Sequence, residues 1–442
     1  MTKKNLLLTL VAAIVVTTVR AGGLMTNTNY HIAFDRMMAR GATFDVDAAY
    51  SNPAGTVWGY DGWQLSLNFQ KPWQNRDIKV ADVTYEGKAS APIVPALFAT
   101  YKHDRWAASA MLGIVGSGGF VEYKQGVPMF NIMLGSMLAA NGMQPNTYKL
   151  DSEMKGKQYI YGGQLNFSYK LTDWLSAAVG LRANYYDGYY RGHVRAIDHP
   201  QLGELAALLL DVDQKGWGFT PLVSLNFHQG PLTVTARYEF RTKVSTENET
   251  NILEAGLGSN VIAAMMAADP TGTPARLAAL SQQLGAYTAP YQDGATTRYD
   301  MPALLSAAVG YEITPKLRAT LEYHFFDDKH AKMSGDRQKE LSHGTHEVLA
   351  GVEYDIDDRF TVSLGGQRTD YGLTDGYQQN TSFACDSYSI GLGGAWNITE
   401  KIRLNAGYFI SLYSDYKKQT AYGEETYSRT NNVVGLGIDF KF

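Results

Sequence analysis

The chain has 442 residues, a formal net charge of −4 and one cysteine, and it is rich in glycine (44) and tyrosine (29). A single cysteine excludes disulfides within the chain, and the slightly acidic pI of about 6.2 argues against a nucleic-acid-binding protein. This length fits either several soluble domains or one large barrel, so the pattern along the chain has to decide.

The first 21 residues have the pattern of a secretory signal. Two lysines precede an apolar run over residues 6–16, and small side chains precede an expected cleavage point after Ala21. An uncleaved anchor is the alternative, but the run is shorter than the roughly 20 residues that a spanning helix needs. We therefore predict an exported protein whose mature chain begins near Gly22.

Residues 22–60 lack the regular alternation of the rest of the chain. Residues 30–40 are typical of a short helix and residues 41–55 of turns. Because so short a segment cannot form its own core, we expect a plug, or hatch, inside a barrel that occupies residues 61–442. Its apolar side chains could line a ligand pocket or serve only to pack the hatch, and the candidates are Phe34, Met37, Met38, Phe44 and Val46.

From Trp63 onward, segments of about ten residues alternate with period two. In residues 232–240 every second side chain is apolar or aromatic, and Arg237 and Glu239 lie on the other face. Because a charge facing lipid near the bilayer centre costs about 2–4 kcal/mol, this segregation indicates an outer face in lipid and a wet lumen. A soluble sandwich, the alternative, would have shorter strands with the apolar face inward.

No later window has 18 uninterrupted apolar residues, so strands rather than helices must span the membrane. Aromatic residues near strand ends, such as Trp174, Tyr185 and Tyr186, indicate girdles at the two membrane interfaces.

The connections between strands alternate in length. Short polar turns, expected in the periplasm, are 102–105, 170–173, 228–231, 313–316, 355–358 and 397–400. Long loops, expected outside the cell, are about 75–91, 121–157, 187–216, 242–298, 327–345, 369–387 and 414–429. This alternation predicts an all-β, transmembrane antiparallel barrel of about 14 strands in the outer membrane.

The last strand ends on Phe442 after alternating apolar residues. A terminal aromatic residue in this setting resembles the signal by which bacterial barrels are recognised for insertion, so we expect Phe442 to contact the barrel-assembly machinery.

The hexapeptide Tyr-Ser-Asn-Pro-Ala-Gly at residues 50–55 follows an alanine-rich stretch and directly precedes the first strand. This arrangement resembles the FadL family of outer-membrane long-chain fatty acid transporters, and the layout of the whole mature chain is similar. The resemblance implies a 14-stranded barrel closed by a hatch, with Asn52, Pro53 and Ala54 matching the hatch motif.

The same resemblance implies an apolar pocket, an inward kink in the third strand and lateral release of substrate into the outer leaflet. The third strand here begins at Trp106 and contains Gly116, Gly118 and Gly119, which become candidates for a lateral opening. They could equally leave room for the hatch. Because the hatch helix has fewer small residues than is usual in the family, the identity of the ligand stays open.

Three of the long loops contain apolar runs that are typical of helices, at residues 129–138, 202–210, and 261–266 with 275–280. Such helices could form a groove that captures a lipid-like molecule, or could form only a cap. The candidate groove residues are Met129, Leu134, Leu209 and Met265. Nearby cations could bind a carboxylate or lipopolysaccharide, namely Lys149, Lys155, Lys157, Arg191 and Arg195.

No nucleotide loop, metal motif or nucleophile elbow is present in the sequence, so we predict no cofactor, metal or catalytic residue. Cys385 is expected to be inert. The favoured function is a monomeric, passive channel for long-chain fatty acids or similar hydrophobic compounds. The alternative is a general porin for small polar solutes, which the charges expected in the lumen leave open: Arg182, Arg237, Glu239, Glu322 and Arg403.

An outer-membrane enzyme and an adhesin are two further alternatives. An outer-membrane enzyme would need a serine and histidine pair at the lipid-facing rim, and an adhesin would need no plug.

Overall fold

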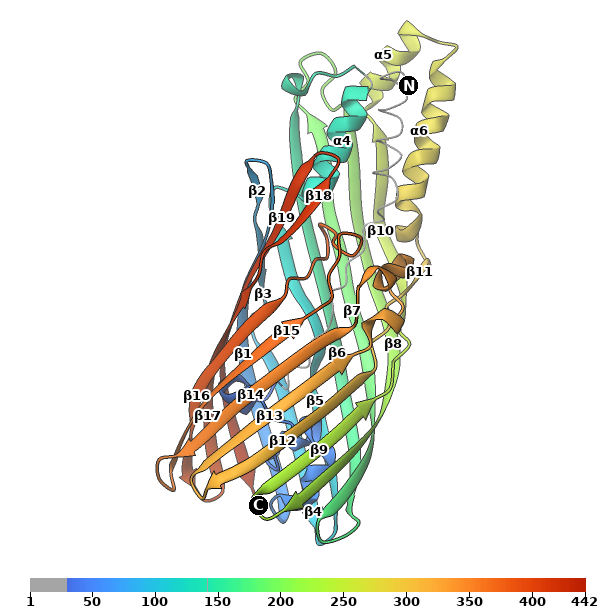
Figure 1. Cartoon of the computed structure of the whole chain (residues 1–442). Helices are drawn as coiled ribbons and strands as arrows, with labels where there is room; N and C mark the ends of the chain where they lie inside the picture. Colours follow the sequence, from blue (N-terminus) through green and yellow to red (C-terminus); the bar gives the residue numbers. More distant parts are fainter. Residues whose placement is uncertain (1–29, 141) are drawn as a thin grey trace.

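The computed structural model describes residues 30–140 and 142–442, and the expected signal segment lies outside this part of the chain. A closed wall of 14 antiparallel strands surrounds a lumen that contains the N-terminal segment (Figure 1). Pairing of the first strand with the last, with Gln64 opposite Lys441, closes the wall. The predicted transmembrane barrel is therefore confirmed.

The wall strands are β1 (Gly62–Val80), β4 (Val94–His103), β5 (Trp106–Tyr123), β6 (Lys149–Lys170), β7 (Leu175–Ile197), β8 (Ala206–Gln229), β9 (Leu232–Glu239), β12 (Leu304–Thr314), β13 (Leu317–Phe326), β14 (Thr345–Asp355), β15 (Phe360–Asp370), β16 (Ser387–Thr399), β17 (Ile402–Tyr413) and β19 (Gly423–Lys441). Five further strands of the described residues extend the wall at the long-loop end: β2 (Val83–Tyr85), β3 (Gly87–Ser90), β10 (Ser245–Leu257), β11 (Thr296–Arg298) and β18 (Tyr416–Thr420).

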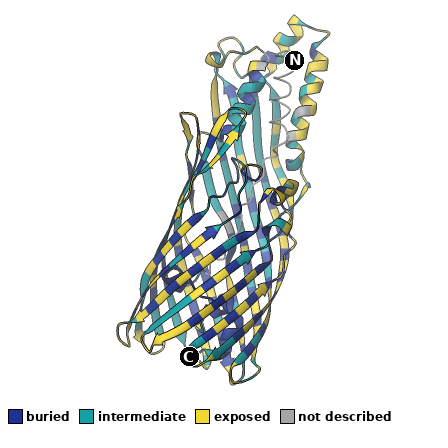
Figure 2. Cartoon of the chain, in the orientation of Figure 1, coloured by how far each residue is buried: buried dark blue, intermediate teal, exposed yellow. Residues whose placement is uncertain are grey.

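Buried and exposed residues alternate along the wall strands (Figure 2). In β9, Val234 and Tyr238 are exposed on the outside, whereas Arg237 and Glu239 are buried on the lumen side. The exposed side chains of the wall are apolar because this face meets lipid rather than water. The predicted assignment of the two faces of β9 is confirmed.

Aromatic rings mark both edges of the apolar band. At the upper edge, the ring of Tyr185 lies 6.4 Å from that of Tyr161 and 4.7 Å from that of Trp217. At the lower edge, Trp174 lies 5.7 Å from Phe227. Tyr186 was also predicted to belong to a girdle, and this is wrong. Adjacent residues of a strand point to opposite faces, so Tyr186 is buried in the lumen.

All six short turns lie where the sequence predicts them, at one end of the barrel. The long loops are shorter than predicted, because β6, β7 and β8 continue well above the aromatic edge with 22, 23 and 24 residues. The predicted helix at 202–210 is wrong, because residues 202–205 form a turn and a short connection. Residues from Ala206 onward belong to β8, where Ala206 pairs with Ala196 of β7 and with Leu257 of β10.

Three helices cover the long-loop end: α4 (Pro128–Ala140), α5 (Ser259–Ala268) and α6 (Thr273–Thr288). None of the helices in the described residues is long and apolar enough to cross a membrane. Short 3-10 helices occur in the loops: η2 (Pro145–Thr147), η3 (Ala289–Tyr291), η4 (Asp328–His330) and η5 (Ser334–Glu340).

The segment inside the lumen consists of α2 (Ile32–Met37), α3 (Ala48–Ser51) and η1 (Pro53–Trp58). The first helix is shorter than the predicted 30–40, because Met38 adopts a positive φ of 66° and ends it. We call this segment, residues 30–61, the hatch.

Candidate functional site

Ion pairs hold the hatch against the wall. Arg36 donates to Glu353 of β14 and, over 2.6 Å, to Ser363 of β15. Arg40 forms a bidentate pair with Asp47 inside the hatch, with both distances 2.8 Å. All these groups are buried, so the hatch and wall form one charged network whose members neutralise one another.

The predicted hatch motif lies at the contact between the hatch and β6–β8. The Asn52 side chain accepts a hydrogen bond from Gly55 N (3.1 Å) and donates to Asn226 Oδ1 on β8 (2.9 Å). The carbonyls of Pro53 and Ala54 accept hydrogen bonds from wall serines over 2.7 and 2.6 Å. The motif thus caps η1 and fastens it to the wall.

The lumen charges that left a porin open are engaged with the hatch or with other wall residues. Arg237 donates to the carbonyl of Tyr50, and Glu322 accepts hydrogen bonds from the backbone nitrogens of Arg40 (2.8 Å) and Gly41 (2.7 Å). Arg182 pairs with Glu239 of the wall, and Arg403 donates to Thr361 of β15 over 3.3 Å. Arg237 and Glu322 therefore position the hatch, and the other three charges have partners within the wall.

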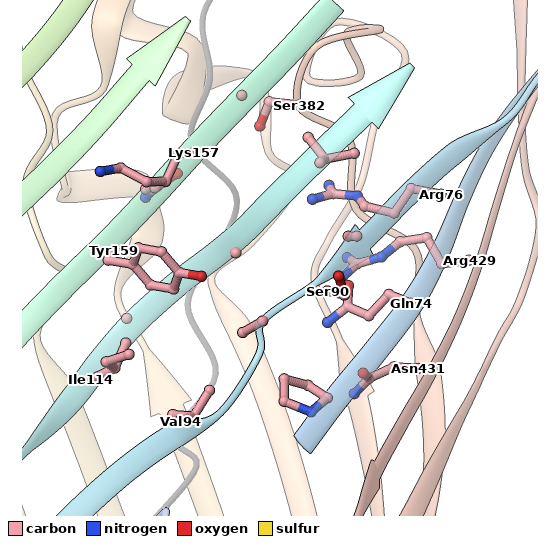
Figure 3. A pocket seen from close by; sticks show the side chains of 18 of the residues that line it. Gln74, Arg76, Ser90, Val94, Ile114, Lys157, Tyr159, Ser382, Arg429 and Asn431 are labelled. Carbon is pink, nitrogen blue, oxygen red and sulfur yellow. The ribbon is translucent and has the colours of Figure 1, made fainter. Parts of the chain in front are cut away.

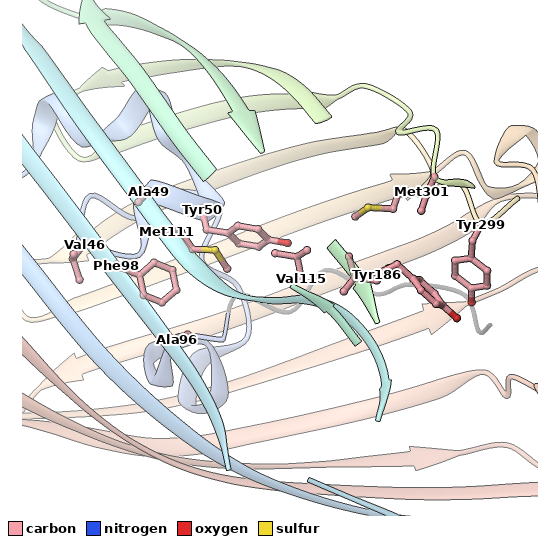
Figure 4. Close-up of a cluster of buried hydrophobic side chains, with 12 residues drawn as sticks. Val46, Ala49, Tyr50, Ala96, Phe98, Met111, Val115, Tyr186, Tyr299 and Met301 are labelled. Carbon is pink, nitrogen blue, oxygen red and sulfur yellow. The ribbon is translucent and has the colours of Figure 1, made fainter. Parts of the chain in front are cut away.

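Above these polar contacts, an apolar cluster joins the hatch to β4–β7 (Figure 4). Val46 and Tyr50 of the hatch pack with Phe98 of β4 and Met111 of β5, and Tyr186 of β7 continues the cluster upward. Burying these side chains separates the lower lumen from the space above it.

That space is a cavity of about 200 Å³ in the upper half of the barrel (Figure 3). We call it the inner pocket. The hatch contributes Tyr30 and Asp35 to its lining, and apolar wall residues contribute most of one side: Ala89, Ala91, Val94, Ile114, Val121, Phe409 and Val433.

The wall beside the inner pocket is interrupted. Pairing of β5 with β4 ends at Leu97 opposite Leu112, and pairing of β5 with β3 begins again at Ser90 opposite Phe120. In the same stretch the register between β5 and β6 shifts twice, between Ile114 and Gly116 and between Ser117 and Gly119. Val94, Ile114, Gly116 and Gly119 all line the pocket, so the pocket reaches the interruption.

The three predicted glycines lie in this stretch of β5, within residues 113–119. Gly119 has a φ of 69°, a conformation that favours glycine and that bends the strand at the second bulge.

A second cavity, of about 50 Å³, lies at the long-loop end. We call it the outer groove. Its lining is largely apolar and comes from α4, β7, β8, β10 and α6: Phe130, Met133, Val194, Leu208, Leu210, Leu253 and Leu284. Met154 of β6 lines both the outer groove and the inner pocket, so the two cavities adjoin at this residue.

The four predicted groove residues surround this cavity without lining it. Leu134 is buried in the cluster that joins α4 to α5, and Met265 packs against the same cluster. Met129 packs against a neighbouring cluster. Leu208 and Leu210 line the groove, which places Leu209 on the opposite face of β8.

The predicted hatch residues lie below the inner pocket or away from it. Phe34 and Met38 pack against Phe409 and Val433, which do line it, so these two support its floor. Met37 lies against wall glycines of β14 and β15, and Val46 belongs to the cluster below. Phe44 packs edge-on against His228, 4.9 Å away, near the short-turn end.

Each of the five predicted loop cations has a carboxylate partner in the structure. Sequence reasoning missed two other cations, Arg76 of β1 and Arg429 of β19, which line the inner pocket. In β1 the even-numbered residues from Gln64 to Gln70 are polar and face the lumen, and extending this parity would have placed Arg76 there as well.

Comparisons with known proteins agree with this geometry. The family model described as outer membrane protein beta-barrel domain matches residues 255–442. No curated protein sequence matches the chain. Among solved structures, a FadL homologue of Pseudomonas aeruginosa has a TM-score of 0.69 at 14% identity, covering 95% of this chain and 100% of that one.

The toluene transporter TodX of P. putida has a TM-score of 0.59 at 13% identity, with 96% and 99% of the two chains covered. The toluene transporter TbuX of Ralstonia pickettii has a TM-score of 0.54 at 14% identity, with 96% and 99% covered. At these identities the comparison establishes the fold, and this fold is that of FadL-type outer-membrane barrels.

Proposed function

We propose that the chain is a FadL-family channel that lets long-chain fatty acids, or similar hydrophobic compounds, diffuse across the outer membrane. The observation that carries the proposal is the succession of two apolar cavities. They adjoin at Met154, and the deeper one reaches the interrupted wall beside β5. The fold it shares with hydrocarbon and FadL-type channels supports the same function.

In this proposal the ligand enters at the outer groove, where Phe130, Leu208 and Leu253 offer an apolar surface to a molecule coming from water. It then passes Met154, whose unbranched side chain can change rotamer at small cost. The inner pocket holds it above the hatch.

Release would occur sideways through the wall between Leu112 and Phe120. Interruption of the ladder there leaves a route from the pocket to lipid that does not require the hatch to leave the barrel. The buried ion pairs of Arg36 and Arg40 support a hatch that stays seated. Transport then follows the concentration gradient of the ligand.

We further propose export by the N-terminal signal and recognition of the terminal strand by the assembly machinery. Phe442 is 61% exposed and its ring stacks on Phe440 at the short-turn end, where another protein could reach it. Contacts with lipopolysaccharide on the outside and a monomeric state belong to the same proposal. A general porin is not favoured, because the lumen charges are bound to the hatch or to other wall residues.

The lateral route can be tested by restoring a regular strand. Deleting Val115 and Gly118 removes one residue from each of the two bulges, which lets β5 pair in register with its neighbour. We expect uptake of labelled oleate by cells expressing this variant to fall to the level of cells without the protein.

The control for that experiment is binding of oleate to the purified deletion variant, which should stay close to wild type because the pocket's other lining residues remain. Uptake at the wild-type rate in a folded variant would contradict lateral release. A second variant, Met154→Trp, should slow uptake by filling the passage between the two cavities while β5 is intact.

A further inference from the structure

Two arginines face one another across the junction of the first and last strands. Arg76 of β1 and Arg429 of β19 are directly paired in the antiparallel register. Both guanidinium groups extend from the wall into the inner pocket (Figure 3). Two positive charges therefore enter one small cavity from adjacent positions.

Both arginines make hydrogen bonds with neutral groups. Arg76 donates to the carbonyl of Phe383 over 3.0 Å, and its guanidinium lies 5.2 Å from the centre of that ring. Arg429 donates to the Gln74 side chain over 3.4 Å and lies 4.6 Å from the ring of Tyr413. The Nε atom of each arginine is buried and has no acceptor among the described residues.

Within the described part of the chain, neither guanidinium has a carboxylate at ion-pair distance. The other charged residues that line the pocket are Asp35 and Lys157. Lys157 pairs with Asp187 over 2.8 Å, and Asp35 of the hatch accepts a hydrogen bond from Gln70 over 2.7 Å. Even an ionised Asp35 balances only one of the two guanidinium charges, so the pocket has an excess of positive charge at Arg76 and Arg429.

Burial of an uncompensated charge is costly, and two adjacent like charges add repulsion. Around the hatch this cost is offset by an acid, as for Arg36 with Glu353 and Arg182 with Glu239. Arg76 is only 9% exposed, so little of its surface is open to water. An anion that entered the pocket would offset the cost of burying both charges.

We propose that Arg76 and Arg429 bind the carboxylate head group of a single-chain amphipathic acid, while its tail lies along the apolar side of the inner pocket. This inference rests on the proposed channel function and names its substrate class. Two guanidinium forks can hold both oxygens of one carboxylate. The tail would contact Val94, Ile114 and Phe409 and point towards the interrupted wall.

A head-group site of this kind separates acids from neutral hydrocarbons. A neutral molecule can fill the apolar side of the pocket, but it leaves both buried guanidinium groups without an anion. Sites built to bind a polar group discriminate strongly against analogues that lack it. The arginine pair thus selects for fatty acids over alcohols or aromatic hydrocarbons of similar apolar area.

The test measures equilibrium binding of two probes, oleate and octadecan-1-ol, to the purified full-length protein in lipid nanodiscs. The variants are Arg76→Gln, Arg429→Gln and the double variant. Lys215→Gln is the control, because it removes a cation that lies outside the pocket and that Glu249 already neutralises. Circular dichroism and the heat-dependent mobility shift of barrels on gels verify folding.

We expect wild type to bind oleate more tightly than octadecan-1-ol. Each single variant should raise the Kd for oleate about 10-fold or more, the range expected for a hydrogen bond to a charged group. The Kd for octadecan-1-ol should change less than about twofold, since this probe makes no charged contact. Lys215→Gln should bind both probes as wild type does, and Arg76→Lys should recover part of the oleate affinity.

Oleate binding that is unchanged in the folded double variant would overturn the head-group site while leaving the channel proposal intact. Equal loss of both probes would also overturn it, because the arginines would then only shape the pocket. Wild-type protein that binds neither probe would instead refute the proposed function and this inference together.

Discussion

The arginines around the hatch and the arginines of the inner pocket differ in the partners that they contact. Around the hatch, Arg36 and Arg40 have carboxylate partners in Glu353 and Asp47. In the inner pocket, Arg76 and Arg429 face each other with neutral partners. Charge in the lower half is therefore internally balanced and structural, whereas charge in the upper half is left available.

The contrast has an energetic meaning. Removing one member of a buried ion pair leaves an unpaired charge, so it costs more than the pair itself contributes. Removing a buried charge that has no partner relieves a penalty. Stability and ligand binding should therefore respond with opposite signs in the two halves.

The largest expected effect comes from breaking the lower network. Glu353→Gln leaves Arg36 and Arg318 without the carboxylate that both contact. We expect the free energy of unfolding to fall by about 3–5 kcal/mol, the usual effect of breaking a buried pair. Urea titration followed by tryptophan fluorescence measures this change. As a control, Glu249→Gln removes the exposed pair with Lys215 and should have no measurable effect, and an equal loss in both variants would refute the contrast.

A buried acid at the rim gives the next effect, which depends on pH. Burial raises the pKa of Asp328 to about 7, although its Oδ2 accepts a hydrogen bond from Thr345 N over 2.8 Å. Folding therefore favours the protonated carboxyl. The free energy that this group contributes to folding is lost as pH rises from about 4 towards 7. Asp328→Asn keeps the acceptor without the charge. Its advantage over wild type should grow to about 4 kcal/mol at pH 8 and vanish near pH 4.

Thermal unfolding of both proteins across this pH range measures the difference directly. A constant difference at all pH values would show that the substitution acts through packing rather than through ionisation.

The hatch motif should give a smaller loss in the lower half. Asn52→Ala removes the acceptor of Gly55 N and the donor to Asn226, for an expected loss of about 2 kcal/mol. Asn52→Asp keeps the acceptor alone and should lose less. Unfolding titrations rank the three proteins, and faster tryptic cleavage of the hatch in Asn52→Ala would confirm where the loss occurs. Equal stability of all three would mean that the motif does not fasten the hatch.

The smallest effect is expected in the upper half and has the opposite sign. Without ligand, Arg76→Gln should raise the free energy of unfolding by about 1 kcal/mol, because it removes repulsion with Arg429. The same urea titration measures it. A marked loss of stability would show that Arg76 is structural and that the two halves do not differ in this way.

The period-two pattern was enough to predict the wall and its faces. The alternation in residues 232–240 and the six short turns required only local information, because a strand with one face in lipid admits few arrangements. The Asn-Pro-Ala motif could also be found from local sequence, because Asn52 caps η1 through Gly55, only three residues away.

The pocket could not be predicted in the same way. Leu208 and Leu209 are chemically alike, and only the register of β8 decides which one faces the groove. The predicted helix at 202–210 failed because its apolar residues meet neighbours on both faces, a pattern that a helix shares with a covered strand. Arg76 is a candidate binding residue because no carboxylate of the described residues lies at ion-pair distance from it. Only the folded structure shows which acids lie near an arginine of the lumen.

The unequal height of the wall decides where a ligand first meets the protein. The 24 residues of β8 extend roughly 80 Å along the strand, whereas the 10 residues of β13 extend roughly 33 Å. The apolar band on β8 ends at Trp217, and Lys215 just above it pairs with Glu249 on the outside. Residues 206–216 therefore stand beyond the lipid head groups.

In the proposed channel, a ligand that binds the outer groove on this tall side is therefore captured above the membrane surface. It then reaches the inner pocket along the protein and not through the lipid.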